Sequence, residues 1–192
     1  MRERPAGFCA APLWYEGQVR EGCCALKFQG PRAAAGPLGE LVARCAAERF
    51  SGEFDVVTWV PVSRRRLRSR GYDQARLLAE SACRLWEVQP ERCCKKHGQP
   101  RPVRADEEAA RRANVLGVYE AAEPERIQGY RILLVDDICT TGATLAECAR
   151  TLRDAGAADV MCVCAALARR PDEKTVGCGV FHRKAGDSRF KK

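Results

Sequence analysis

Two apolar runs separated by a helix-length segment constrain the fold of this chain more than any other feature. Ile132 to Val135 is continuously aliphatic, and Val160 to Leu167 is a second apolar run. Such runs are typical of strands covered on both faces of a parallel sheet. Between them, helical spacing predicts an amphipathic helix, closed by Gly156 in the left-handed conformation, from the positions of Leu145, Cys148, Ala149 and Leu152. Strand, helix and strand in this order predict an α/β fold with a mostly parallel sheet.

The rest of the chain supplies further elements of the same fold. Apolar spacing predicts helices over about residues 37–49 and 73–86, and a buried strand over about residues 54–60. Residues 89–113 are polar, and we expect them to form a mobile loop with a short helix. We expect a single domain over residues 1–169 and a basic, flexible tail over residues 170–192.

The charge balance is basic. The 192 residues carry 33 Lys plus Arg against 25 Asp plus Glu, a formal net charge of +8. That excess permits nucleic acids, membrane surfaces or phosphorylated small molecules as partners and does not choose among them. No apolar stretch approaches the roughly 20 residues that a membrane helix needs. The N-terminus, interrupted by Pro5, Pro12 and Glu16, is a poor signal peptide, so we expect a cytoplasmic protein with no membrane partner.

Twelve cysteines are many for a cytoplasmic chain. No Cys-x-x-Cys pair occurs, so the spacing of a zinc ribbon is absent. Cys93, Cys94 and His97 make the best partial metal site, but no second half follows at a suitable spacing. We expect most of the cysteines to act as small buried apolar residues in a reduced compartment. His97 and His182 have no motif around them, and we expect both to be exposed.

The segment after the first apolar run carries the most specific chemistry. Asp136 and Asp137 follow the run directly, at the sheet edge where open α/β folds bind ligands. Adjacent carboxylates can accept hydrogen bonds from the vicinal hydroxyls of a ribose. The residues that follow offer hydroxyl donors, a permissive glycine and a helix N-terminus to a phosphate, and they are Thr140, Thr141, Gly142, Ala143 and Thr144. The pattern predicts a site for a sugar 5′-phosphate; in the alternative, the acids only cap the helix.

This segment resembles the signature of the phosphoribosyltransferase family, which is four apolar residues, two acids and a Thr-Thr-Gly-x-Thr loop for phosphoribosyl pyrophosphate. No Gly-x-Gly-x-x-Gly fingerprint and no Walker lysine occurs, which excludes the usual dinucleotide and P-loop sites. The resemblance implies a type I phosphoribosyltransferase fold, with helices on both faces of the sheet and a small N-terminal hood. It also implies that Asp136 and Asp137 hold the ribose hydroxyls and that residues 140–144 hold the 5′-phosphate.

A second strand end leads into an arginine-rich stretch. Five arginines lie within the seven residues from Arg64 to Arg70, directly after Ser63. Guanidinium groups match phosphate oxygens, so Ser63 and Arg64 are candidates for holding a pyrophosphate leaving group. The stretch holds more charge than one pyrophosphate requires. A solvated basic patch, or one that contacts the backbone of a nucleic acid, is therefore an equal alternative.

The arginine-rich stretch and the Asp136 signature together resemble the ComF family of competence-associated phosphoribosyltransferase-like proteins. The resemblance also draws on Arg111 to Asn114, on Pro12 to Gly17 and on Leu26 to Phe28, and it spans residues 12–169. That family commonly carries a zinc ribbon ahead of this region, whereas only Cys9 precedes Pro12 here. We therefore expect either a short branch of the family or a truncated start.

Two further positions depart from the family pattern. The family tends to have Asn where this chain has Asp73, and a Gln ahead of the mobile loop where this chain has Val103. In phosphoribosyltransferases that loop closes over the reacting centre and shields a cation-like sugar from water. The loss of a polar residue there leaves open whether the protein turns over as an enzyme.

The resemblance implies Mg²⁺-dependent binding of phosphoribosyl pyrophosphate and glycosyl transfer to an unidentified acceptor. Asp136 and Asp137 would help to locate the metal directly or through water, Ser63 and Arg64 would hold pyrophosphate, and Arg111 is the candidate that reaches into the closed site. Arg111 as a solvated helix charge is equally consistent with the sequence. The alternative function is a non-catalytic factor in DNA uptake that binds single-stranded DNA; protein partners leave no signal in the sequence.

Overall fold

The computed structural model describes residues 9–28, 31–97, 116–168 and 180–181. Five strands of its main sheet follow the order β3-β6-β7-β1-β8, and β2 also pairs with β7. All pairs are parallel except that between β1 and β8. The strands are β1 (Cys9–Ala10), β2 (Leu13–Trp14), β3 (Val56–Trp59), β6 (Arg131–Cys139), β7 (Asp159–Leu167) and β8 (Val180–Phe181). The predicted α/β fold with a mostly parallel sheet is therefore confirmed.

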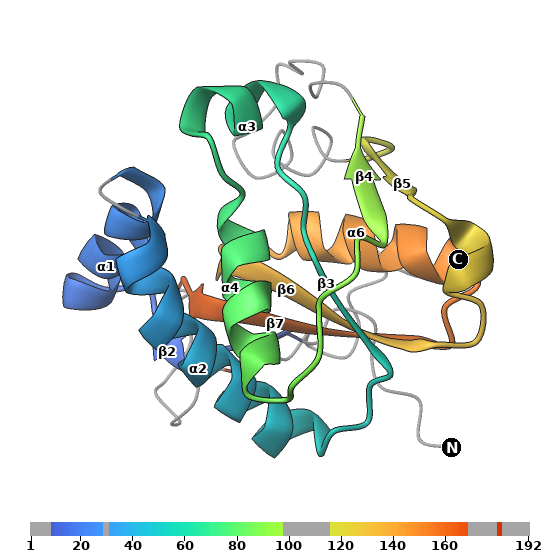
Figure 1. Cartoon of the computed structure of the whole chain (residues 1–192), viewed down its shortest axis with the longest axis horizontal. Helices are drawn as coiled ribbons and strands as arrows, with labels where there is room; N and C mark the ends of the chain where they lie inside the picture. Colours follow the sequence, from blue (N-terminus) through green and yellow to red (C-terminus); the bar gives the residue numbers. More distant parts are fainter. Residues whose placement is uncertain (1–8, 29–30, 98–115, 169–179, 182–192) are drawn as a thin grey trace.

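Helices cover both faces of this sheet (Figure 1). The long helices on one face are α2 (Pro31–Phe50) and α4 (Gln74–Arg84), and the helix on the other face is α6 (Ala143–Asp154). Alternate residues of β6 divide between the two layers, because successive side chains of a strand point to opposite faces. Leu133 and Val135 pack with the side chains of α2 and α4, whereas Leu134 packs with those of α6.

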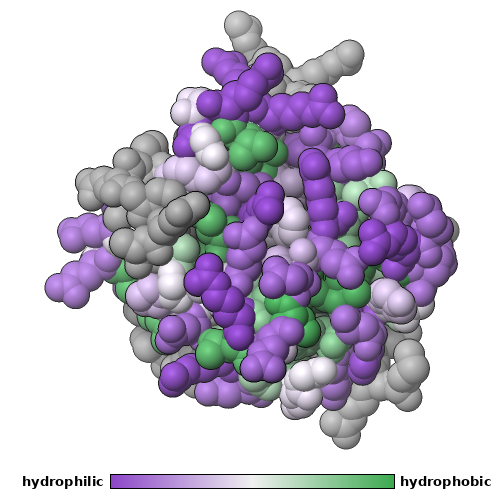
Figure 2. All heavy atoms as spheres, in the orientation of Figure 1, coloured by the Kyte–Doolittle hydropathy of each residue, from purple (hydrophilic) through white to green (hydrophobic). Residues whose placement is uncertain are grey.

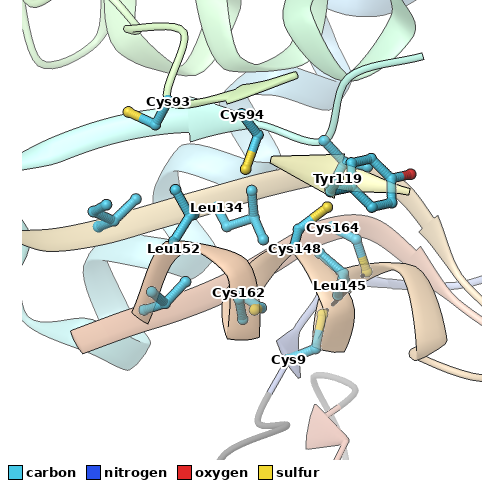
Figure 3. Packing of buried hydrophobic residues seen from close by; sticks show 14 of the residues in the cluster. Cys9, Cys93, Cys94, Tyr119, Leu134, Leu145, Cys148, Leu152, Cys162 and Cys164 are labelled. Atoms are coloured by element: carbon cyan, nitrogen blue, oxygen red, sulfur yellow. Dashed lines mark hydrogen bonds between the residues drawn. The ribbon is translucent and has the colours of Figure 1, made fainter. Parts of the chain in front are cut away.

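Cysteines fill much of the core under α6. Figure 3 shows Cys148 of α6 between Leu145 and Leu152, on the face of the helix turned towards Leu134. The 11 cysteines of the described part of the chain are all free, and all but Cys24 are buried. This agrees with their expected role as small apolar residues.

The N-terminal segment, expected to form a small hood, contributes to the main sheet. β1 pairs with β7 through Cys9 and Cys162, and β2 continues along the same strand. Helix α1 (Gly17–Phe28) follows and packs against α2 (Figure 1). At the other end of the chain, β8 pairs with β1, so the sheet includes two residues of the predicted tail.

Several boundaries differ from those predicted. Helix α2 begins at Pro31 rather than near Pro37, which lies inside the helix. Proline fits the first turn because its missing N–H has no partner there, and Pro31 takes that position. Within the polar stretch predicted as a loop, β4 (Cys94–Lys96) pairs antiparallel with β5 (Tyr119–Ala121). Residues 98–115, which include Val103 and Arg111, lie outside the described residues.

The β4–β5 pair is anchored beside the main sheet. The Glu91 N–H donates to the carbonyl of Val57 at 2.8 Å, and the Cys93 N–H donates to the Thr58 hydroxyl at 3.2 Å. Two short helices complete the described structure, α3 (Arg64–Arg70) and the 3₁₀ helix η1 (Pro124–Arg126). Among the described residues, no helix has the length and apolar character needed to cross a membrane.

Candidate functional site

A cleft of about 320 Å³ lies at the carboxyl ends of β3 and β6. This is the edge at which α/β sheets bind ligands, because the loops leaving neighbouring parallel strands meet there. Three parts of the chain form its walls: the turn after β3 with α3 and the start of α4, the β4–β5 pair, and the end of β6 with the start of α6. The lining residues are Val60, Pro61, Val62, Arg66, Arg70, Gln74, Ala75, Lys96, Tyr119, Asp136, Asp137, Ile138 and Thr144.

The two predicted carboxylates belong to β6 itself. Asp136 pairs in register with Cys164 of β7, and the strand continues to Cys139. The sequence predicts that this strand ends at Val135, which is wrong because the apolar run of β7 extends far enough to pair with Asp136, Ile138 and Cys139. Each carboxylate accepts a hydrogen bond from the next backbone N–H, Asp136 at 2.8 Å and Asp137 at 2.7 Å. The position agrees with a role at the cleft rather than at a helix cap.

The start of α6 shows that the two acids do not serve as a helix cap. The N-cap residue is Gly142, with φ 76° and no side-chain capping bond. Gly142 adopts this left-handed conformation at no steric cost, so the chain can turn sharply from the strand into the helix. Asp136 and Asp137 therefore do not cap α6.

The electrostatic setting of Asp136 disfavours two negative charges side by side. Its removal from water and the neighbouring Asp137 carboxylate raise the pKa of Asp136 well above its ordinary value. A cation, or a hydroxyl that donates to the carboxylate, would favour the ionised form. The pair is thus suited to a ligand that brings such groups.

The threonine loop lies beside the acids. Thr144, in the first turn of α6, lines the cleft, and the Thr141 hydroxyl accepts a bond from the Ala143 N–H at 3.4 Å. Thr140 is exposed. The structure thus brings Thr144 together with Asp136 and Asp137, with Gly142 and Ala143 forming the turn that leads to it.

The basic stretch after β3 folds into α3. Ser63 caps this helix, and its hydroxyl accepts from the Arg66 N–H at 3.3 Å. Ser63 and Arg64, the predicted pyrophosphate ligands, are not among the cleft-lining residues; Arg66 and Arg70 are. Figure 2 shows strongly hydrophilic side chains gathered over α3 at the top of the molecule. The cap at Ser63 therefore orients a helix whose later arginines reach the cleft.

Asp73 connects that turn to α4. Its carboxylate accepts from the Val62 N–H at 3.0 Å and from the Arg76 N–H at 3.3 Å. Burial raises the pKa of Asp73, and the bonds from these two N–H groups oppose that rise. This residue, where the ComF pattern has Asn, is the N-cap of α4 and fixes Gln74 at the cleft.

The β4–β5 pair supplies the third wall. Lys96 and Tyr119 lie opposite each other in register, with the ammonium 3.0 Å from the phenol oxygen and 4.9 Å from the ring centroid. Burial, followed by the nearby Arg66, lowers the pKa of Lys96. Burial also raises the pKa of Tyr119. Both shifts disfavour charge in the cleft without a ligand.

Sequence reasoning missed the residues of two walls. Lys96 and Tyr119 have no motif around them, and the positions of Arg66 and Arg70 depend on where α3 begins. Gln74 did leave a signal, because it lies four residues before Leu78 and therefore on the apolar face of α4. The predicted residue Arg111 lies outside the described residues.

The described residues contain no group of three or more His, Cys, Asp or Glu side chains arranged to hold a metal ion. The partial site suggested by Cys93, Cys94 and His97 is therefore not completed within the described part of the chain. His97 is exposed, as predicted, and its ring pairs with Glu120.

Part of this chain is similar to known phosphoribosyl transferase domains. Residues 101–185, a little under half of the chain, match the model of the phosphoribosyl transferase domain. No curated protein matches the sequence. The solved glutamine phosphoribosylpyrophosphate amidotransferase from B. subtilis, complexed with ADP and GMP, is 22% identical with a TM-score of 0.50. That likeness covers 74% of this chain and 30% of the B. subtilis chain.

Two further solved structures are similar over part of their length. An allosteric regulatory enzyme of purine biosynthesis is 22% identical, with a TM-score of 0.49, over 74% of this chain and 30% of its own. Phosphoribosylpyrophosphate synthetase from Mycobacterium smegmatis is 21% identical, with a TM-score of 0.41, over 68% of this chain and 33% of its own. The chain thus spans about a third of the solved chains it resembles. It has the α/β fold of the phosphoribosyltransferase type, and its residues 101–185 match the phosphoribosyl transferase domain.

Proposed function

We propose that this protein binds phosphoribosyl pyrophosphate with Mg²⁺ in the cleft and transfers the phosphoribosyl group to an acceptor, as a glycosyltransferase. One observation carries the proposal. Asp136, Asp137 and Thr144 line the same cleft as the cationic side chains Arg66, Arg70 and Lys96. A ligand with a hydroxylated sugar and phosphates at both ends suits such a cleft, because each wall offers the partner that one part of the ligand requires.

The walls suggest how the ligand is oriented. The ribose hydroxyls would donate to Asp136 and Asp137, and the turn from Thr140 to Thr144 would hold the 5′-phosphate at the positive end of α6. Arg66 and Arg70, which line the cleft, would hold the pyrophosphate in place of Arg64. Ser63 then contributes as the cap that orients α3.

The donor set fits Mg²⁺. This ion prefers oxygen ligands and is commonly held by one or two carboxylates together with substrate phosphates and water. Asp136 and Asp137 provide the carboxylates, directly or through water, and the ligand would provide the phosphate oxygens. When bound, Mg²⁺ neutralises charge on the pyrophosphate leaving group.

The reaction we propose is displacement of pyrophosphate from C1 of the ribose through an oxocarbenium-like transition state. The residues act by position and charge, because no side chain has to form a bond to the sugar. Cationic side chains stabilise the departing pyrophosphate, and the carboxylates keep the sugar oriented while positive charge develops on it. Arg111 remains our candidate for a residue that reaches the closed site.

Titration calorimetry tests the proposal. The unmodified protein should bind phosphoribosyl pyrophosphate with micromolar affinity only when Mg²⁺ is present. The variant Asp136→Asn/Asp137→Asn should lose binding yet fold, because each asparagine keeps an acceptor oxygen for the next backbone N–H. Asp154→Asn, which changes an exposed acid at the far end of α6, is the matched control and should bind normally. No binding by the unmodified protein would overturn the proposal.

A second candidate function rests on the exposed face of α3. Arg64, Arg65, Arg66 and Arg68 are all exposed on one seven-residue helix. Resemblance to the ComF family, which is associated with competence, suggests single-stranded DNA as the polyanion. The affinity of the protein for single-stranded DNA should fall steeply as the salt concentration rises. A plot of the logarithm of the binding constant against the logarithm of the salt concentration should have a slope of about −0.7 for each phosphate contacted. A flat salt response, or unchanged affinity in Arg65→Ser/Arg68→Ser, would contradict this candidate.

A further inference from the structure

The side chain of Gln74 has a buried amide nitrogen without a hydrogen-bond partner. The residue is 2% exposed and lines the cleft. Its Nε2 is the one fully buried side-chain nitrogen or oxygen atom, among the described residues, without a hydrogen-bond partner. Buried polar groups are almost always paired in native proteins, because an unpaired one loses its hydration without compensation. An unpaired amide in the wall of a binding cleft therefore indicates a partner that the ligand supplies.

The backbone of Gln74 is fixed on both sides. It is the first residue of α4, directly after the Asp73 cap that binds the Val62 and Arg76 N–H groups. Its successor Ala75 is 3% exposed and belongs to the core between α2 and α4. The backbone thus holds Gln74 at the wall of the cleft, and rotation of its side chain about its own bonds presents the amide to a ligand.

The chemistry of the neighbouring wall identifies the partner. An Nε2 group only donates, so it requires an acceptor oxygen. Gln74 belongs to the wall that follows β3, as do Arg66 and Arg70, and Lys96 lines the same cleft. The carboxylates and the threonine turn, suited to sugar hydroxyls and the 5′-phosphate, come instead from β6 and α6. A neutral donor in the cationic wall fits an oxygen of the pyrophosphate group.

We infer that Gln74 is a ligand-contacting residue whose Nε2 donates a hydrogen bond to the pyrophosphate part of phosphoribosyl pyrophosphate. This inference rests on the proposed function and names a residue that neither the signature nor the arginine stretch contains. A contact between Gln74 and the ligand has a consequence that a purely structural role would not have. Replacing Gln74 with an apolar residue of similar length should stabilise the unliganded protein, because an unpaired buried amide disappears, and should weaken the ligand at the same time.

The test compares Gln74→Met with unmodified protein, using three probes in the presence of Mg²⁺: phosphoribosyl pyrophosphate, inorganic pyrophosphate and ribose 5-phosphate. The Tm of the unliganded variant should rise. Its affinity for the first two probes should fall at least tenfold, whereas its affinity for ribose 5-phosphate should change less than twofold. Gln89→Met is the matched control, since Gln89 is exposed and outside the cleft, and should change none of these affinities.

Each other outcome overturns the inference. A lower Tm for Gln74→Met would identify a structural residue, and unchanged pyrophosphate affinity would show that the amide does not contact the ligand. Selective weakening of ribose 5-phosphate would place the contact on the wrong part of the ligand. If the unmodified protein binds phosphoribosyl pyrophosphate and Gln74→Met binds it equally well, only this inference fails. If the unmodified protein does not bind it, the proposed function fails as well.

Discussion

The Glu147 carboxylate of α6 accepts a hydrogen bond of 2.8 Å from the backbone N–H of Gly117. The Glu147 side chain is only 4% exposed and also pairs with Arg150 at 2.7 Å. Because Gly117 stands two residues before Tyr119, this bond ties the start of β5 to the helix that carries the threonine turn. Two walls of the cleft are thereby fastened to each other through a residue that does not line it.

We therefore expect Glu147→Ala to loosen the β4–β5 wall. It should lower the free energy of unfolding by about 2 kcal/mol, because the Gly117 N–H loses its charged acceptor. Arg150→Met keeps the bond to Gly117 and should cost less, so it serves as the control. Chemical denaturation of both variants, with calorimetry of phosphoribosyl pyrophosphate binding, measures the effects. Equal losses of stability in the two variants would contradict the role given to Gly117.

The same carboxylate predicts an acid dependence of stability. Hydrogen bonds from Arg150, and secondarily from Gly117, lower the pKa of Glu147. A group whose pKa is lower in the folded state stabilises the fold above its ordinary pKa of about 4.3 and loses that effect as the pH falls through the lowered value. The stability difference between the unmodified protein and Glu147→Gln should therefore shrink below about pH 4. Denaturation midpoints from pH 7 to pH 3 measure it, and a constant difference would count against this account.

Asp73 allows a graded prediction. Asp73→Ala removes the acceptors of both the Val62 and the Arg76 N–H groups and should cost about 2 kcal/mol of stability. Asp73→Asn keeps one acceptor oxygen but turns an NH₂ group towards the other donor, and should cost about 1 kcal/mol. Thermal and chemical unfolding of the two variants measure the order. If Asp73→Ala left the stability unchanged, the cap would not be what holds the turn.

The part of the site nearest the strand β6 could be predicted from sequence because its chemistry is local. Asp136, Asp137 and Thr144 occur within nine residues, and their order along the chain already implies a strand end beside a helix start. The fold class followed for the same reason, since long apolar runs mark strands buried on both faces. These features depend on neighbours in the sequence.

The opposite walls could not be predicted, because tertiary contacts create them. β4 has three residues, two of them lysines, and pairs with Tyr119 across a separation of 23 residues, so no periodic pattern marks either strand. Lys96 and Tyr119 meet only when that pair forms. Gln74 did fall on the apolar face of α4, but whether a polar residue there is buried beside a ligand depends on the turn that Asp73 holds.

The contact between α2 and α4 gives a prediction about stability alone. A Cβ on Gly39 would lie 2.4 Å from the Cβ of Ser81 and 3.1 Å from the backbone oxygen of Leu78, so the helices would have to separate. Gly39→Ala should therefore cost about 1–3 kcal/mol. Gly36, one turn earlier in α2, has open space around it, and Gly36→Ala should be neutral or stabilising by up to about 1 kcal/mol. Denaturation curves of the two variants measure both changes in stability. Changes of the same sign in both variants would contradict the packing argument.

The lysines of β4 give a matched pair for the cleft. Lys96 points to Tyr119 and lines the cleft, whereas the ammonium of its neighbour Lys95 donates to the Ala122 carbonyl at 3.2 Å on the other face of the strand. If Lys96 binds a phosphate oxygen, Lys96→Met should weaken phosphoribosyl pyrophosphate about tenfold or more, the effect of losing a charged hydrogen bond of about 1.5–3 kcal/mol.

Lys95→Met removes the same charge from the same strand and should leave the affinity within about twofold, since only local contacts change. Because burial lowers the pKa of Lys96 in the cleft without a ligand, and an anion would favour its charged form, binding should draw a proton into the unmodified protein as the pH rises towards that pKa. Calorimetry in two buffers of different ionisation enthalpy measures that uptake. Equal affinities for the two variants would show that the charge of β4 acts only through the general field of the protein and that Lys96 does not touch the ligand.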